Sequence, residues 1–242
     1  MFGFTYYSPT EIVFGPETEA LAGPLVRKWG GSRVLVVCGG HSARSSGLLD
    51  RVVQSLTQEG LACAVLEGVQ PNPLLSTAQA GVEQARQFGA DFLLGVGGGS
   101  VLDTAKAIAD GAASPGTGLW DFWSRKTPLA QALPVGAVLT IPAAGSESSD
   151  SAVLTQDETQ IKRGLSSPLH RPRFAVMNPE LACTLPRYQV ACGTVDIMMH
   201  TMDRYFSKPT GNELTDEIAQ GLLRTVVRNG RRAFENPGDA QA

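Results

Sequence analysis

The stretch "GVGGGSVLDTAKAIA" (residues 95–109) decides the fold, because it joins an apolar run to a segment with helical periodicity through three glycines. Glycine has no Cβ, so the backbone of such a turn can approach a ligand closely. The first turn of a helix offers unpaired N–H groups and the positive end of the helix dipole, and both favour phosphate groups. The stretch therefore predicts a strand, a tight turn and a helix that binds a pyrophosphate through Gly97, Gly98, Gly99 and Ser100, with Ser100 also capping the helix.

Two better-known phosphate motifs are excluded at this turn. A GxGxxG fingerprint needs glycine where Ser100 stands, and no GxxxxGK[ST] sequence is present. We expect Asp103 to lie near the loop and to contribute to the site, with Lys106 on or near the same face of the helix. The simpler alternatives are a tight turn without a ligand, with Asp103 as a partner of the helix dipole and Lys106 as a surface charge.

The rest of the chain up to residue 180 alternates between strand and helix patterns. Near-continuous apolar strands that alternate with helices are typical of an α/β fold with a parallel sheet. The pattern predicts helices at 17–30 (interrupted by Pro24), 45–60 and 74–90, and strands at 33–40, 61–67, 91–100, 136–142, 151–155 and 173–179. The aromatic first thirteen residues suggest a hairpin or an exchanged edge strand.

After residue 180 the sequence predicts only helices, at about 187–206 and 213–234. We therefore expect a dinucleotide-binding domain over residues 1–180 and the first helices of a second, helical domain over residues 181–242.

Composition narrows the class of protein. The chain of 242 residues has a net charge of −3, which gives no basic footprint for nucleic acid. The cysteines show no CxxC spacing, so we expect reduced thiols and a cytoplasmic protein. No apolar run reaches membrane-spanning length. We therefore expect a small molecule as the partner, and we expect binding to neither nucleic acid nor a membrane.

Three segments together resemble a known family: "GVGGGSVLDTAKAIA", "LTIPAAGSESSDSAVLT" (139–155) and "FAVMNPELACTLPRYQVACGTVDIMMHTMDRYFS" (174–207). They are similar, in order and spacing, to the iron-containing (group III) alcohol dehydrogenases, in the branch of NADPH-dependent aldehyde reductases and butanol dehydrogenases. The resemblance implies a Rossmann-like domain followed by an all-helical domain, as in the dehydroquinate synthase-like architecture. It also implies a homodimer, a nicotinamide coenzyme, and one divalent metal, Fe²⁺ or Zn²⁺. It assigns coenzyme contacts beyond the glycine loop to Asn72, Thr140, Ser146, Lys162 and Leu181.

The end of the strand at 33–40 bears on the choice of coenzyme. A carboxylate there suits the 2′-hydroxyl of NAD, whereas the 2′-phosphate of NADP needs a cation. The strand ends without Asp or Glu, and Gly39, Gly40, Ser42 and Arg44 follow. Glycine leaves room, Ser42 can donate a hydrogen bond, and Arg44 can pair with phosphate. We therefore expect NADP(H); the alternative is a solvated loop.

The expected metal site is incomplete. Asp196 and His200 lie one helical turn apart and match the family's first two ligands. The family's two further histidines have no counterpart, since only His41 and His170 remain. Cys192 and Asp203 share the helix face of Asp196 and are weaker candidates.

Two classes of function follow. The first is an oxidoreductase of aldehydes and primary alcohols, with this chain a C-terminally truncated piece of it; a related glycerol-type dehydrogenase is a variant of that hypothesis. The second is a nucleotide-binding remnant without turnover.

Overall fold

The computed structural model describes residue 3 and residues 5–207, 212–239 and 241, which fall into two compact units. The first comprises the residues up to Thr140 together with Gly145–Asn178. The second comprises Ile141–Ala144 and the residues from Pro179 onward. Among the described residues, no helix combines the length and the apolar character that crossing a membrane requires.

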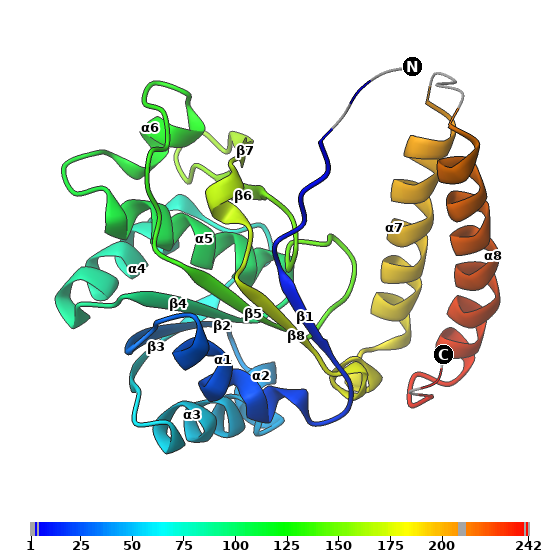
Figure 1. Cartoon of the computed structure of the whole chain (residues 1–242), viewed down its shortest axis with the longest axis horizontal. Helices are drawn as coiled ribbons and strands as arrows, with labels where there is room; N and C mark the ends of the chain where they lie inside the picture. Colours follow the sequence, from blue (N-terminus) through cyan, green and yellow to red (C-terminus); the bar gives the residue numbers. More distant parts are fainter. Residues whose placement is uncertain (1–2, 4, 208–211, 240, 242) are drawn as a thin grey trace. The chain divides into compact units, whose positions relative to one another are not determined.

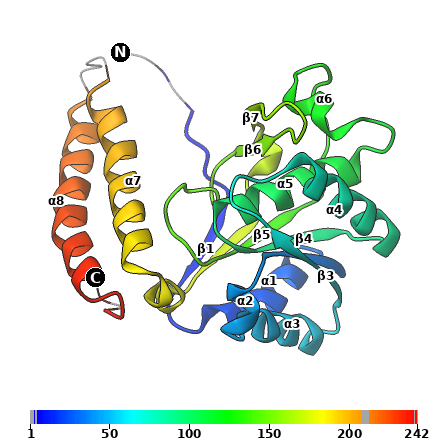
Figure 2. The ribbon, with the colours of Figure 1, turned by 180° about the vertical axis from the view of Figure 1, so that it is seen from behind.

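A six-stranded parallel sheet forms the centre of the first unit, in the order β1-β8-β5-β4-β2-β3. Helices cover both faces, with α1, α2 and α3 on one and α4 and α5 on the other (Figures 1 and 2). The strands are β1 (Glu11–Phe14), β2 (Arg33–Gly39), β3 (Ala62–Val69), β4 (Phe92–Gly97), β5 (Val135–Leu139) and β8 (Phe174–Met177). The helices are α1 (Ala22–Lys28), α2 (Ser42–Ser45), α3 (Leu48–Gln58), α4 (Leu75–Phe88), α5 (Gly99–Ala113) and α6 (Leu119–Trp123). The expected α/β fold with a parallel sheet is confirmed.

The core explains why β4 and α5 hold the glycine turn in place. Every residue of β4 is buried, and most of α5 is buried as well. A Cβ on Gly95 would lie 2.7 Å from Leu102 Cδ2, so the helix packs directly on the strand. A Cβ on Gly136, in β5, would lie 2.5 Å from Phe174 Cζ in β8. The approach of Leu102 to Gly95 holds β4 and α5 against each other, and that of Phe174 to Gly136 holds β5 against β8, because a tightly packed core leaves little room for adjustment.

The N-terminal segment differs from the prediction. Its described residues form neither a hairpin nor an exchanged strand: β1 pairs in parallel with β8 of the same chain, with Glu11 opposite Phe174, while residues 1, 2 and 4 lie outside the described part. The sequence suggested another chain as the distant partner of this strand. In the structure the partner is β8, so the pairing joins the two ends of the first unit.

The segment 151–155 also differs from the prediction of one sheet. It forms β6 (Ser151–Thr155), which pairs antiparallel with β7 (Lys162–Ser166) in a separate two-stranded sheet. The sequence analysis missed β7 because its residues are mostly exposed and polar. It also missed α6, a short helix of apolar and aromatic residues.

The second unit contains two long helices, α7 (Arg187–Tyr205) and α8 (Glu213–Glu235), which lie side by side (Figure 1). The helices approach closely near Gly230, where a Cβ would lie 2.2 Å from Thr194 Cγ2. Asn212 caps α8 by accepting a hydrogen bond from the N–H of Thr215. The expected helices at 187–206 and 213–234 are therefore present, with ends shifted by a residue at most.

Candidate functional site

The glycine turn ends β4 and begins α5. Gly98 has an extended conformation and precedes the helix, and its carbonyl accepts hydrogen bonds from the N–H groups of Val101 and Leu102 at 3.0 and 3.2 Å. No side chain among the described residues caps this helix. Its first N–H groups, on Gly99 and Ser100, have no partner within the helix, as at any helix start. The turn therefore presents backbone donors at the carboxyl edge of the parallel sheet, where ligands bind in such folds.

One detail of the turn corrects the sequence-based prediction, and a second adds to it. Ser100 is not the cap, because it lies inside the helix, and its carbonyl accepts a hydrogen bond from Thr104 Oγ1 at 2.8 Å. Gly97 is needed for internal packing, since a Cβ there would lie 2.6 Å from Val101 Cγ2. Thr140, which follows β5, donates its N–H to the Gly97 carbonyl at 3.1 Å and so lies beside the turn.

Lys106 lies in the interior of the protein, and the alternative of a surface charge is wrong. Its side chain is fully buried, and Nζ donates to the carbonyls of Ser146 at 2.8 Å, Ser149 at 3.2 Å and Ser151 at 2.8 Å. It also donates to Ser146 Oγ at 2.9 Å. Burial lowers the pKa of Lys106 to about 8, against the opposing effect of the Asp103 carboxylate.

Asp103 belongs to the same buried network. Its carboxylate accepts hydrogen bonds from Ser146 Oγ at 2.7 Å and from the N–H of Val153 at 3.1 Å. Burial raises the pKa of Asp103, while the hydrogen bond from Ser146 and the charge of Lys106 oppose that rise. Asp103 and Ser146, both predicted as coenzyme contacts, thus bond to each other, and Ser146 also bonds to Lys106. Their contacts in this structure position the segment after β5.

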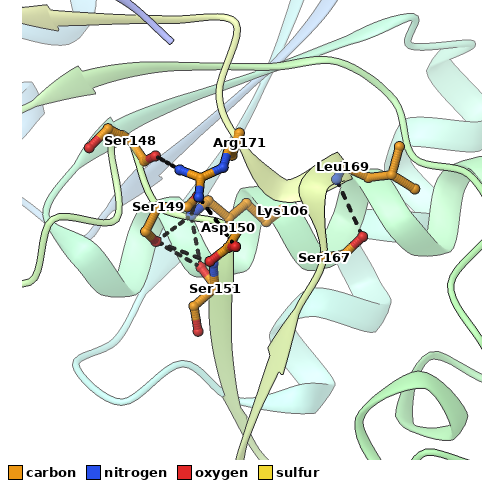
Figure 3. Close-up of polar contacts among 8 residues, drawn as sticks. All are labelled: Lys106, Ser148, Ser149, Asp150, Ser151, Ser167, Leu169 and Arg171. Atoms are coloured by element: carbon orange, nitrogen blue, oxygen red, sulfur yellow. Dashed lines mark hydrogen bonds and ion pairs between the residues drawn. The ribbon is translucent and has the colours of Figure 1, made fainter. Parts of the chain in front are cut away.

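A second cation holds the same segment. Arg171 Nη1 donates to the carbonyl of Ser148 at 2.8 Å, and Nη2 contacts Asp150 Oδ2 at 3.3 Å. Figure 3 shows Lys106 and Arg171 converging on residues 148–151. Sequence analysis did not single out Arg171, since nothing in the local sequence links it to a segment more than twenty residues earlier.

The end of β2 carries the predicted ribose site. A Cβ on Gly40 would meet nothing within 4 Å, so this turn is open. Ser42 begins α2, and Arg44 lies in the same short helix. Arg44 forms an ion pair with Glu67 of β3, through Nε–Oε2 at 3.1 Å and a short Nη2–Oε1 contact. The sequence did not indicate Glu67, because it belongs to β3 and the sequence alone does not show that β3 pairs beside β2.

The structure brings together two further predicted contacts that are far apart in sequence. Lys162, the first residue of β7, donates through Nζ to Asn72 Oδ1 at 2.8 Å. Asn72 has a positive φ of 59°, which asparagine tolerates better than most residues. Leu181 lies in a short 3₁₀ helix, Pro179–Thr184, of the second unit.

Another buried pair was not foreseen. His170 Nε2 lies 2.8 Å from Asp110 Oδ2, and neither side chain is exposed to solvent. The His170 ring stacks on Trp123 with ring centroids 6.1 Å apart. Burial raises the pKa of Asp110, and the hydrogen bond to His170 opposes the rise. The pair ties α5 to the segment before β8 and takes no direct part in the glycine turn.

The predicted metal ligands lie on α7. Asp196 Oδ1 and His200 Nε2 are 3.6 Å apart on an exposed face of the helix. Within the described ranges, no group of three or more His, Cys, Asp or Glu side chains is placed to hold a metal ion. Catalytic zinc sites have three protein ligands, so this pair does not fit a complete site.

Comparison with known proteins finds a matching family model and relatives of similar sequence. The model of the family described as iron-containing alcohol dehydrogenase matches residues 9–179. NADH-dependent butanol dehydrogenase A of Clostridium acetobutylicum is 38% identical over 242 residues, covering 100% of this chain and 62% of that protein. NADPH-dependent aldehyde reductase YqhD of Escherichia coli is 38% identical over 241 residues, covering 98% of this chain and 61% of that protein.

Solved structures agree with the sequence matches. NADH-dependent butanol dehydrogenase A from Thermotoga maritima superposes with a TM-score of 0.93 at 38% identity, covering 99% of this chain and 60% of that one. Escherichia coli YqhD gives a TM-score of 0.91 at 35% identity and covers 99% and 61%. The chain thus spans 62% and 61% of the two curated relatives named above. The resemblance drawn from the sequence motifs is confirmed, and the chain belongs to the iron-containing alcohol dehydrogenase family.

Proposed function

We propose that this chain binds NADP(H) and acts as part of an oxidoreductase that interconverts aldehydes and primary alcohols. The observation that carries the proposal is the uncapped start of α5 at the glycine turn, on the carboxyl edge of the sheet. Backbone donors at a helix start suit a pyrophosphate without further charge. Membership of the family, and relatives named as butanol dehydrogenases and an aldehyde reductase, support the reaction class.

In this proposal different residues bind different parts of the coenzyme. The backbone of Gly97, Gly98, Gly99 and Ser100 binds the pyrophosphate. Gly39, Gly40 and Ser42 admit the adenosine ribose, and Arg44 pairs with its 2′-phosphate. The remaining contacts fall to Asn72, Asp103, Thr140, Ser146, Lys162 and Leu181.

The nicotinamide ring of a bound coenzyme supplies the hydride that reduces an aldehyde carbon. The chain's own part is to bind and orient. Lys106 and Arg171 hold the segment at residues 146–151 in one position through its carbonyls and Asp150. Orientation of reacting groups accounts for a large share of enzymatic rate enhancement, so this rigid support favours turnover.

We propose Asp196 and His200 as two ligands of an Fe²⁺ or Zn²⁺ ion. Because the described residues supply no third ligand nearby, the pair alone does not make a catalytic site, and no step of the reaction is derived through a metal. The same observation favours the second candidate function, a chain that binds nucleotide without turning over substrate.

Titration with NADPH, followed by its fluorescence, tests binding. Gly98→Asp places a carboxylate against the pyrophosphate, and we expect an affinity loss of at least about tenfold from like-charge repulsion. Gly164→Asp, on the exposed strand β7, is the matched control and should bind as the unaltered chain does. Equal binding by Gly98→Asp would overturn the assignment of the pyrophosphate to this turn.

Turnover separates the two candidate functions. NADPH oxidation is followed with butanal, with and without added Fe²⁺ or Zn²⁺. Turnover supports the oxidoreductase, and it should fall in His200→Ala if that side chain is a ligand. Tight NADPH binding without turnover supports the nucleotide-binding alternative.

We further propose a cytoplasmic homodimer. The described cysteines are all free thiols, which suits a reducing compartment. The outer strand β1 exposes the side chains of Ile12 and Phe14. An exposed apolar edge strand is a natural place for a second copy to pair, and sedimentation velocity tests the oligomeric state.

A further inference from the structure

The ion pair between Arg44 and Glu67 joins two neighbouring strands at the predicted ribose site. Strand β2 pairs in parallel with β3, with Val37 opposite Leu66, so Glu67 lies beside the end of β2. Arg44 is in α2, directly after that end, and it contacts both carboxylate oxygens of Glu67. The guanidinium therefore faces the carboxylate with two donors, which is the geometry that it would also offer to a phosphate.

Folding stability does not explain this pair. The side chain of Arg44 is 57% exposed and that of Glu67 is 36% exposed. Exposed pairs of this kind contribute little to stability, because water and salt screen them and two long side chains lose freedom. Both charges are instead accessible to a ligand at the turn after β2, which is open at Gly40.

The charges at this turn decide which coenzyme is favoured. The hydrogen bond from Arg44 lowers the pKa of Glu67, so the carboxylate is ionised at neutral pH. The positive charge of Arg44 is then balanced, and a 2′-phosphate meets a neutral pair instead of a cation. A 2′-hydroxyl, in contrast, can donate to the Glu67 carboxylate, as acidic residues do in NAD sites. His41 is the other titratable group that acts on Glu67, and Asp50 and Cys38 also act on Arg44.

We propose that Glu67 is a specificity-determining residue, which competes with the coenzyme's 2′-phosphate for Arg44 and so weakens the preference for NADPH over NADH. This inference rests on the proposed coenzyme site. It assigns opposite roles to two residues in contact: Arg44 favours the phosphate and Glu67 opposes it. The chain accordingly accepts NADH as well as NADPH until Glu67 is neutralised.

Isothermal titration of the whole chain with NADPH and with NADH tests the proposal without need for turnover. Glu67→Gln keeps the size of the side chain and removes its charge. We expect it to tighten NADPH binding about tenfold, as one freed charge-assisted contact would. The affinity for NADH should stay the same or fall slightly. The gain should shrink as salt is raised, because salt screens exposed charges.

Two further variants make the result specific. Glu59→Gln removes the carboxylate of a similar exposed pair, with Arg27, and should leave both affinities unchanged. Glu67→Gln combined with Arg44→Gln should lose the gain in NADPH affinity. An unchanged ratio of the two affinities in Glu67→Gln overturns the role of Glu67 while leaving the coenzyme site intact. Failure of the unaltered chain to bind either coenzyme overturns the proposed function, and this inference with it.

Discussion

Replacement of Lys106 by methionine is the sharpest test of the buried network. Methionine has nearly the same length and volume, so it removes the charge and the donors without opening a large cavity. The substitution leaves the carbonyls of Ser146 and Ser151 without the donor that lies 2.8 Å from each. It also leaves the Asp103 carboxylate without its neighbouring cation.

The expected loss follows from these contacts. Removal of one partner of a buried charged pair costs about 3–5 kcal/mol. Residues 148–150 are only half-buried, so water can replace part of what is lost. We therefore expect the lower end, about 3 kcal/mol, in the free energy of unfolding. At a slope of about 3 kcal/mol per molar urea, the midpoint falls by about 1 M.

Tryptophan fluorescence during urea unfolding measures this loss in the first unit alone. All three tryptophans, Trp29, Trp120 and Trp123, lie in that unit. The control is Lys28→Met, which removes an exposed lysine paired with Glu11 and should cost less than about 1 kcal/mol. If Lys106→Met shifts the midpoint no more than this control, the buried ammonium does not hold the segment after β5, and the reasoning fails.

Three further predictions rest on buried contacts. Burial lowers the pKa of Lys106 from the ordinary lysine value of 10.5 to about 8, so the native state binds fewer protons than the unfolded chain between these values. The free energy of unfolding should therefore rise with pH over that window in the unaltered chain relative to Lys106→Met. Gly136→Ala forces a Cβ against the Phe174 ring, 2.5 Å away, and overpacking should cost about 1–3 kcal/mol in urea unfolding. His170→Ala leaves the buried Asp110 carboxylate unpaired, and a loss of about 3 kcal/mol should lower the midpoint of thermal unfolding by about 6–12 °C.

Each of these has a control. Unfolding free energies that run parallel from pH 8 to 10.5 in the two chains would show that Lys106 does not titrate there. Gly164→Ala, whose Cβ would meet only Val153 Cγ2 at 4.0 Å, should be neutral, and a cost equal to that of Gly136→Ala would contradict the packing argument. His41→Ala changes an exposed histidine and should leave the midpoint unchanged. A similar midpoint for His170→Ala would mean that the pair with Asp110 adds nothing.

Local patterns were sufficient for the main elements of the fold. The buried strands and amphipathic helices have distinct periods, so β2, β4, α4 and α5 could be predicted from neighbouring residues alone. Pairings between distant segments could not, because period and propensity carry no information on partners. The parallel pairing of β1 with β8 and the separate hairpin of β6 and β7 are both of this kind.

The same limit applies to the candidate site. The glycine turn was visible because its donors come from consecutive residues. The sequence left a surface position open for Lys106, because its acceptors lie some forty residues later, on a segment with no local sign of its fold. Arg44 looked free because Glu67 comes from the next strand. The sequence therefore indicated which charged residues lie near the site, but it did not show which residues they pair with.

The pairing of β1 with β8 has a consequence for the order of folding. A ribosome delivers β1 first, yet its partner is the last strand of the first unit to be made. The four strands β2 to β5 pair with one another and are all made before β8, so they can assemble earlier, while pairings between distant segments form slowly. Until Phe174–Met177 emerges, the fully buried strand β5 presents an open apolar edge. A nascent chain stalled before that point carries a surface prone to self-association.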